Sequence, residues 1–286
     1  MTAKVYDERP CELGEGPLWH PERQQLFWFD ILGQRLLTRE DGTAREWRFE
    51  EIVSAAGWTG RDTLLIASET KLFEFNLVTG GSDTVVRLES DASATRSNDG
   101  RADPHGGFWI GTMGKSAGPG AGAIYRYYRG DLRRLFSPIT IPNSICFAPD
   151  GSRAYFADTT QRRILTQPLD PQGWPRGDPR IFVDLRAEGL NPDGSVTDAQ
   201  GNLWNAQWGA GRIAGYSPNG DFREAFDFPA RHTSCPALGG RGLATLFCTT
   251  AREHLSPEIL EAEPQNGQTF ACETGLEGWP EPRVIL

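Results

Sequence analysis

The chain has 286 residues, of which 38% are hydrophobic and 23% charged, and its formal net charge is −9. This composition is typical of a globular protein rather than a disordered one, and dispersed acidic charge without a basic stripe argues against nucleic acid and anionic membranes as partners. The N-terminal stretch lacks the apolar segment of a signal peptide and no run approaches the roughly 18 apolar residues of a membrane span, so we expect a cytoplasmic protein, a monomer by default.

Short strands separated by turns are predicted along the whole chain, because Gly (33) and Pro (20) interrupt its apolar runs. A turn followed by a β-branched or aromatic run recurs, in chain order, in PERQQLFWFD from residue 21, TGRDTLLIAS from 59, PHGGFWIGTM from 104, PDGSRAYFAD from 149, AQGNLWNAQW from 199 and GRGLATLFCT from 240. A further strand is predicted after each, in RLLTRE, KLFEFN, AIYRYY, RILTQP, RIAGYS and QTFACE.

The six units begin about 40 to 50 residues apart, which is near the period of a four-stranded propeller blade. We therefore predict an all-β fold, a six-bladed β-propeller with four-stranded blades around a central channel, formed as a single domain by residues 1–286. In such a fold the blades bury their sheet faces against one another and few strand edges stay exposed. The alternative is another all-β stack, such as a double sandwich.

Oxygen-bearing side chains recur at one position of these units, six residues before the turn. In chain order that position holds Glu15, Val53, Asn98, Asn143, Asp193 and either Thr233 or Ser234. Each blade's innermost strand should begin beside the channel, so equivalent positions form a ring around the axis. We therefore expect four of these side chains to meet: Glu15, Asn98, Asn143 and Asp193.

Two carboxylates and two amide carbonyls facing one point would repel and be poorly solvated without a cation. Hard oxygen ligands of this kind suit Ca²⁺, Mg²⁺ or Mn²⁺, and also Fe²⁺. Zinc held by histidines is less favoured, because the chain has four histidines and none is paired at i, i+4. The alternative is that each side chain only hydrogen-bonds its own turn. The coincidence of four in one register favours a cation site.

Four blocks of the chain resemble the SMP-30/gluconolactonase/LRE (regucalcin-like) family. They are GEGPLW at 14–19, RSNDGRADPHGGFWIGTM at 96–113, PNSICFAPDGSRAYFADT at 142–159 and NPDGSVTDAQGNLWNAQWG at 191–209. The resemblance covers nearly the whole chain and implies a six-bladed propeller. It also implies one divalent cation (Ca²⁺, Mg²⁺, Mn²⁺, Zn²⁺ or Fe²⁺) held by Glu15, Asn143 and Asp193.

The same resemblance implies that Arg96 and Asn98 contact the substrate and that Asp193 is the general base. The register alone would have made Asn98 a fourth ligand. After Gly111-Thr112-Met113, regucalcin-like members carry acidic residues that touch the sugar, whereas this chain reads GKSAGPGAGA. The preference for a particular carbohydrate therefore does not carry over.

The function expected from the resemblance is hydrolysis of a sugar (aldono) lactone to the aldonic acid, with the cation polarising the carbonyl and Asp193 accepting a proton from water. Lactones of gluconate, xylonate, arabinonate and galactonate are candidate substrates. A promiscuous metal-dependent phosphotriesterase and a non-catalytic calcium-binding propeller scaffold are the alternatives.

Several tryptophans follow the repeat and are expected to pack between blades rather than to stack on sugars. Trp208 is the one that needs checking, because it lies past the end of a predicted strand. His232, near the start of the sixth unit's first strand, is expected to line the channel in a supporting role.

Overall fold

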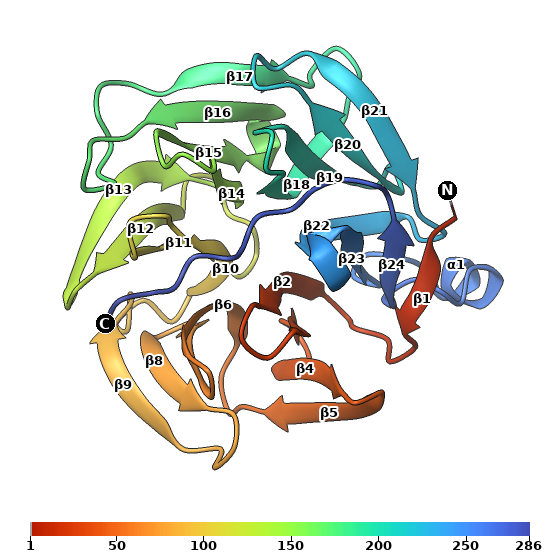
Figure 1. Cartoon of the computed structure of the whole chain (residues 1–286), viewed down its shortest axis with the longest axis horizontal. Coiled ribbons are helices and arrows are strands. Elements are labelled where there is room, and N and C mark those ends of the chain that lie inside the picture. Colours follow the sequence, from red (N-terminus) through yellow and green to blue (C-terminus); the bar gives the residue numbers. More distant parts are fainter. Residues whose placement is uncertain (1) are drawn as a thin grey trace.

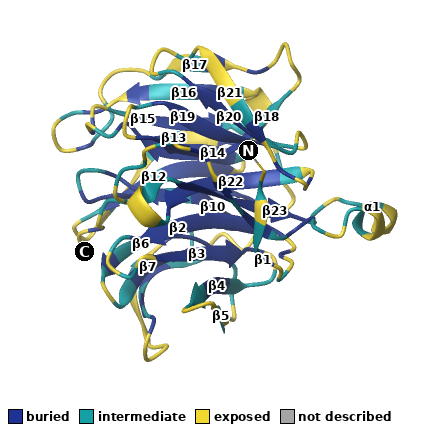
Figure 2. Ribbon diagram, turned by 45° about the vertical axis from the view of Figure 1, so that its right-hand side comes forward, coloured by how far each residue is buried: buried dark blue, intermediate teal, exposed yellow. Residues whose placement is uncertain are grey.

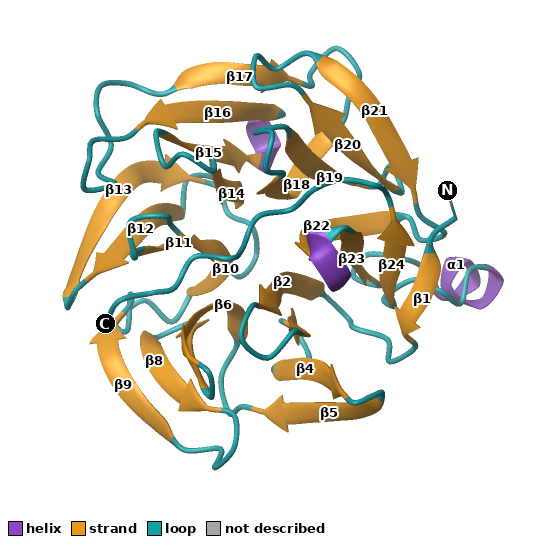
Figure 3. Ribbon diagram, in the orientation of Figure 1, coloured by secondary structure: helices purple, strands orange, loops and turns teal. Residues whose placement is uncertain are grey.

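Six four-stranded antiparallel sheets succeed one another around a central axis in the computed structural model, which describes residues 2–286 (Figure 1). This arrangement is the predicted six-bladed β-propeller. Nearly all of the regular structure is strand (Figure 3). Within residues 2–286, no helix has the length and apolar character needed to cross a lipid bilayer.

Five sheets are built from strands that are consecutive in the chain. The first two contain β2 (Gly14–His20), β3 (Gln25–Asp30), β4 (Arg35–Glu40) and β5 (Thr43–Arg48), then β6 (Val53–Gly60), β7 (Thr63–Ser68), β8 (Lys71–Asn76) and β9 (Ser82–Arg87). The third contains β10 (Thr95–Ala102), β11 (Phe108–Gly114), β12 (Gly122–Tyr128) and β13 (Asp131–Ile139). The next two contain β14 (Pro142–Phe147), β15 (Arg153–Asp158), β16 (Arg163–Pro168) and β17 (Arg180–Asp184), then β18 (Asn191–Thr197), β19 (Leu203–Trp208), β20 (Arg212–Tyr216) and β21 (Phe222–Asp227).

The sixth sheet joins the two ends of the chain. It contains β22 (His232–Gly239), β23 (Thr245–Ala251) and β24 (Thr269–Glu273), and its outermost strand is β1 (Lys4–Asp7). Three short helical segments lie between strands: η1 (Thr159–Gln161), η2 (Arg241–Leu243) and α1 (Pro257–Ala262). The helix α1 stands outside the ring (Figures 1 and 2).

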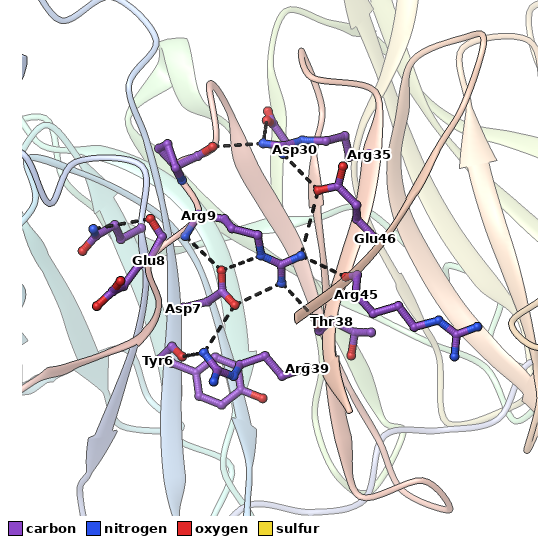
Figure 4. A network of polar contacts seen from close by, with 12 residues as sticks. Tyr6, Asp7, Glu8, Arg9, Asp30, Arg35, Thr38, Arg39, Arg45 and Glu46 are labelled. Carbon is purple, nitrogen blue, oxygen red and sulfur yellow. Dashed lines mark hydrogen bonds and ion pairs between the residues drawn. The ribbon is translucent and has the colours of Figure 1, made fainter. Parts of the chain in front are cut away.

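A polar network next to β1 ties this last blade to the first one (Figure 4). The carboxylate of Asp7 accepts from Arg9 Nε at 2.9 Å, and Arg9 Nη2 donates to the backbone oxygen of Thr38 at 2.9 Å. Arg39 Nη1 lies 3.6 Å from Asp7 Oδ2. Because Asp7 is almost fully buried, these contacts compensate its charge and fasten the closure of the ring.

The innermost strands are buried on both faces and the outermost strands are exposed (Figure 2). Every residue of β2 is buried, whereas β5 has only exposed or half-buried residues. Apolar side chains of neighbouring blades share the core; for example, Phe27 of β3 packs in one cluster with Leu64 of β7. The predicted packing role is confirmed for Trp28, Trp109 and Trp204, which are at most 1% exposed.

Candidate functional site

A cavity of about 280 Å³ lies at the end of the channel where the first strands of the blades begin. All five residues predicted as site residues line it: Glu15, Arg96, Asn98, Asn143 and Asp193. Each of them is at most 6% exposed. The residues at the corresponding places in the second and sixth blades, Val53 and Thr233 or Ser234, are buried but are not among the lining residues that the structure describes.

Irregularities in the strand ladders bring these side chains into the channel. The register between first and second strands shifts just after Glu15 and just after Asn143. In the other two blades the shift begins one residue earlier, so Asn98 and Asp193 lie inside the bulge. The count of six residues back from the turn had predicted four equivalent positions, but this offset shows that they are not strictly equivalent. Bulges re-aim side chains, which lets all four line the same cavity despite this offset.

Glycine is required beside Glu15 for steric reasons. Gly16 has a φ of +55°, in the left-handed region, and a Cβ at this position would collide with the backbone oxygen of Ser54 in the neighbouring blade. The backbone nitrogen of Gly16 also donates to Glu15 Oε2 at 3.1 Å. The flanking glycine thus allows the bend and helps to hold the carboxylate.

The carboxyl groups of Glu15 and Asp193 line the same cavity and lie close enough to affect each other's ionisation. Burial raises the pKa of Glu15, and the charge of Asp99 raises it further. Burial, followed by the charge of Glu15, raises the pKa of Asp193 well above the usual range of an aspartate. Ionising both of two neighbouring buried carboxyls costs much free energy, because the two negative charges repel each other and are poorly solvated. Without a cation the pair therefore retains a proton.

Asp193 is anchored through its backbone oxygen. Ser144 Oγ donates to the backbone oxygen of Asp193 at 2.6 Å, and Asn205 Nδ2 donates to the same oxygen at 3.0 Å. These two bonds fix the position of the residue while its carboxylate stays directed at the cavity.

A directed chain of hydrogen bonds runs along one side of the cavity. Arg96 Nη1 donates to Asn98 Oδ1 at 2.8 Å, and Asn98 Nδ2 donates to Asn143 Oδ1 at 3.0 Å. Asn143 Nδ2 donates to Thr159 Oγ1 at 2.8 Å, which in turn donates to the backbone oxygen of Pro192 at 2.8 Å. Because the Asn98 amide also donates to the backbone oxygen of Pro142 at 2.9 Å, both of its N–H groups are engaged.

A third buried carboxylate, Asp99, contributes to the negative potential of the channel. The backbone nitrogen of Ile145 donates to Asp99 Oδ2 at 2.7 Å, while burial raises its pKa to about 6. Asp99 was not among the residues predicted from the sequence. The only available signal was its place directly after Asn98 in the RSNDG segment.

The mouth of the cavity contains further residues that the sequence did not predict. Lys115 and Ala117 come from the glycine-rich segment after β11, and Glu253 and His254 from the segment after β23. Lys115 forms an ion pair with Glu69, and its backbone nitrogen donates to the backbone oxygen of Ala94 at 2.8 Å. Loop residues of this kind carry no periodic signal, so their position in space depends on tertiary contacts.

The donor set fits a divalent cation. Glu15 and Asp193 supply buried carboxylate oxygens whose charge no protein ion pair neutralises within residues 2–286. The carbonyl oxygen of Asn143 accepts one hydrogen bond, from Asn98, and keeps a second lone pair. Oxygen donors of this type suit hard divalent ions. Asn98 Oδ1 fits less well, because the guanidinium of Arg96 already lies 2.8 Å from it.

Comparison with known proteins agrees with this geometry. A family model described as "SMP-30/Gluconolactonase/LRE-like region" matches residues 13–252. An L-arabinolactonase of Azospirillum brasilense is 37% identical, with 95% of this chain and 91% of the relative covered. A 6-deoxy-6-sulfogluconolactonase of Pseudomonas putida is 30% identical, with 98% of each chain covered.

A solved structure also superposes closely. It is that of a calcium-binding protein, regucalcin, from Agrobacterium tumefaciens, with a TM-score of 0.98 and 40% identity over 100% of this chain and 98% of the other.

Proposed function

The chain belongs to the SMP-30/gluconolactonase/LRE-like family, and from this premise we propose that it hydrolyses the cyclic ester of a sugar (aldono) lactone with the help of one divalent cation. The observation that carries the proposal is the pair of facing carboxyls, Glu15 and Asp193, at the base of a cavity of about 280 Å³. A cavity of this size suits a single small ring, since it lies at the lower limit of ordinary ligand pockets.

Glu15, Asn143 and Asp193 would hold the cation. When bound, the cation supplies positive charge that polarises an ester carbonyl and favours the ionised form of both carboxylates. Its identity among Ca²⁺, Mg²⁺, Mn²⁺, Zn²⁺ and Fe²⁺ is left to experiment, because oxygen donors accept several of these ions.

Asp193 would act as the general base. Its backbone is fixed by Ser144 and Asn205, so its carboxylate is held in place to accept a proton from a water molecule as that water attacks the carbonyl carbon. An aspartate whose position is fixed in this way reduces the entropy cost of reaching the transition state.

Arg96 and Asn98 would orient the substrate. In the described chain, Arg96 uses only Nη1 for hydrogen bonds, so Nε and Nη2 remain available for hydroxyl or ring oxygens. Asn98 has already committed both N–H groups, so it would accept from a substrate hydroxyl through Oδ1. This division of donor and acceptor supports a substrate role for Asn98 rather than a ligand role.

The test is acid release from a panel of glucono-, xylono-, arabinono- and galactono-lactones, followed with a pH indicator. We expect chelator-treated protein to be inactive and to recover when one of the five cations is added. Asp193→Asn should lower kcat by about 10²- to 10⁴-fold while the circular dichroism spectrum is unchanged.

Paraoxon is included in the panel, because preferential hydrolysis of paraoxon would favour a phosphotriesterase. Cation binding without any turnover would favour a calcium-binding scaffold.

A further inference from the structure

Trp208 differs from the tryptophans that pack between blades. It is the last residue of β19, it is half-buried, and it lines the cavity. In the ladder it pairs with Asn191, two residues before Asp193. Its side chain packs against the apolar cluster that contains Leu13, another residue of the cavity wall. The cavity therefore has an aromatic wall close to the proposed base.

His232 holds this wall in place. The rings of Trp208 and His232 are stacked, with centroids 4.1 Å apart and an angle of 17° between their planes. A half-buried indole that is stacked on a supporting ring has little freedom to turn away.

We propose that the indole of Trp208 is the surface on which the ring of the substrate lies, and that His232 positions this indole. This inference rests on the proposed lactone hydrolysis and adds a substrate class to it. A closed sugar ring presents C–H groups on a face and hydroxyls at its edge, which matches a cavity with an indole wall and polar groups such as Arg96 and Glu253. An open-chain ester of the same acid has these hydroxyls and one more, from the former ring oxygen, but no rigid face. Trp208 therefore selects cyclic over acyclic esters.

The experiment compares an aldonolactone with the methyl ester of the same aldonic acid, used as a substrate or as a competitive inhibitor. Trp208→Ala should raise KM for the lactone by about 2- to 10-fold, because the stacked face is lost. The kcat should change by less than about 2-fold, since the indole touches no reacting atom in this arrangement. The KM or Ki of the methyl ester should stay unchanged. Trp208→Phe keeps an aromatic face and should restore most of the affinity, and it also serves if the alanine variant folds poorly.

Two His232 variants separate positioning from general structural support. His232→Phe keeps a ring for stacking, whereas His232→Gln keeps hydrogen-bonding capacity but removes the stack. We expect His232→Gln to raise the lactone KM and His232→Phe to leave it near the wild-type value. Combined with Trp208→Ala, His232→Gln should add no further increase, because the two residues act as one unit. A purely structural histidine would instead lower the melting temperature of both variants and leave the KM ratio of lactone to ester unchanged.

The outcomes distinguish the two proposals. Wild-type protein that hydrolyses no lactone overturns the proposed function and this inference with it. Active wild-type protein whose Trp208→Ala variant retains the lactone KM, or loses affinity equally for lactone and methyl ester, overturns the proposed role of Trp208 alone.

Discussion

The two ends of the central channel both hold buried charged side chains, but the charges are balanced in different ways. At the cavity end, the buried carboxyls of Glu15 and Asp193 line one cavity, and the charge of Glu15 raises the pKa of Asp193. At the opposite end, Arg101 Nη1 donates to both carboxylate oxygens of Glu281, at 2.9 and 3.0 Å. The side chains of this second pair are only 8% and 13% exposed.

The partner of Arg101 comes from the C-terminal strap, which we define as residues 274–286. It runs from the end of β24 across the face of the propeller (Figure 1). Trp279 Nε1 donates to Thr197 Oγ1 at 3.0 Å, and the backbone nitrogen of Val284 donates to the backbone oxygen of Trp58 at 2.9 Å. The strap thereby joins separate blades and covers this end of the channel.

The two ends of the channel thus compensate buried charge in different ways. A buried charge is costly unless an opposite charge and hydrogen bonds accompany it. The strap end contains both partners within the chain, so it needs nothing from outside. The cavity end holds two carboxyls and the guanidinium of Arg96, which forms no ion pair with either of them within residues 2–286, so its most stable form requires either a proton or a cation. The uncompensated end is therefore the end that can bind and react.

The largest effect is expected from removing one of the facing carboxyls. Glu15→Gln should lower lactone hydrolysis by at least about 100-fold, because a ligand and its charge are lost. The melting temperature of the metal-free variant should equal or exceed that of metal-free wild type, since a like-charge contact disappears. Glu188→Gln, at an exposed position, is the matched control and should change neither property. A Glu15→Gln variant with normal activity would contradict the assignment of the cavity end.

Breaking the ion pair at the strap end should affect stability rather than chemistry. Glu281→Ala leaves Arg101 buried without its partner and should reduce the free energy of unfolding by about 3 to 5 kcal/mol, measured by urea denaturation. The double variant Arg101→Met/Glu281→Met should recover most of that loss, because apolar side chains replace both charges. A double variant as unstable as the single one would show that the charges are not the reason for the effect.

The pH dependence of stability should also distinguish the two ends. The folded-state pKa of Glu15 is raised by burial from 4.5 to about 8, so the metal-free folded protein holds a proton that the unfolded chain releases. The contribution of protonated Glu15 to the free energy of unfolding is complete below about pH 4.5 and is lost as the pH rises through about 8. Metal-free wild type should therefore lose about 4 kcal/mol relative to Glu15→Gln between these limits, measured by denaturation at successive pH values.

Asp99, His20 and His232 largely cancel in that difference, whereas Asp193 does not, because the charge of Glu15 is one cause of its raised pKa. Burial raises the pKa of Asp99, as it does that of Glu15, and lowers the pKa values of His20 and His232. These three residues are present in both proteins. Adding the preferred cation should remove the loss in wild type and leave the variant unaffected. A loss of equal size in both proteins would mean that the facing carboxyls are not its source.

The sequence predicted the blades well because each blade is a local unit. The run QLFWFD, bounded by turns, became β3 at residues 25–30, and LWNAQW became β19 at residues 203–208. Four of the lining residues, Glu15, Asn98, Asn143 and Asp193, were predicted because they recur at nearly the same place in successive units, whereas Arg96 was expected from the family resemblance alone. The position of Asp193 inside a β-bulge was not predicted, because a bulge changes the strand pairing without changing the spacing of polar residues in the sequence.

Contacts between distant segments left no comparable signal. Arg101 and Glu281 are 180 residues apart, and nothing in either local pattern indicates the other. The pairing of β1 with β24 joins the two ends of the chain in the same way. Lys115 reaches the cavity mouth from a glycine-rich segment whose path is set by backbone contacts with Ala94 and by the ion pair with Glu69. Such positions depend on the folded ring as a whole.

The smallest effect is expected from weakening the strap without disturbing its charges. Trp279→Phe removes the hydrogen bonds from the indole nitrogen to Thr197 and should lower the free energy of unfolding by about 0.5 to 1.5 kcal/mol. Thr197 Oγ1 still donates to the backbone oxygen of Phe147 at 2.7 Å, so no buried hydroxyl is left without a partner. The kcat and KM for the lactone should remain within about 2-fold, because the strap end and the cavity end share no side chain. If the variant unfolds as wild type does but loses tenfold in kcat, the strap is coupled to the cavity and the two ends cannot be treated as independent.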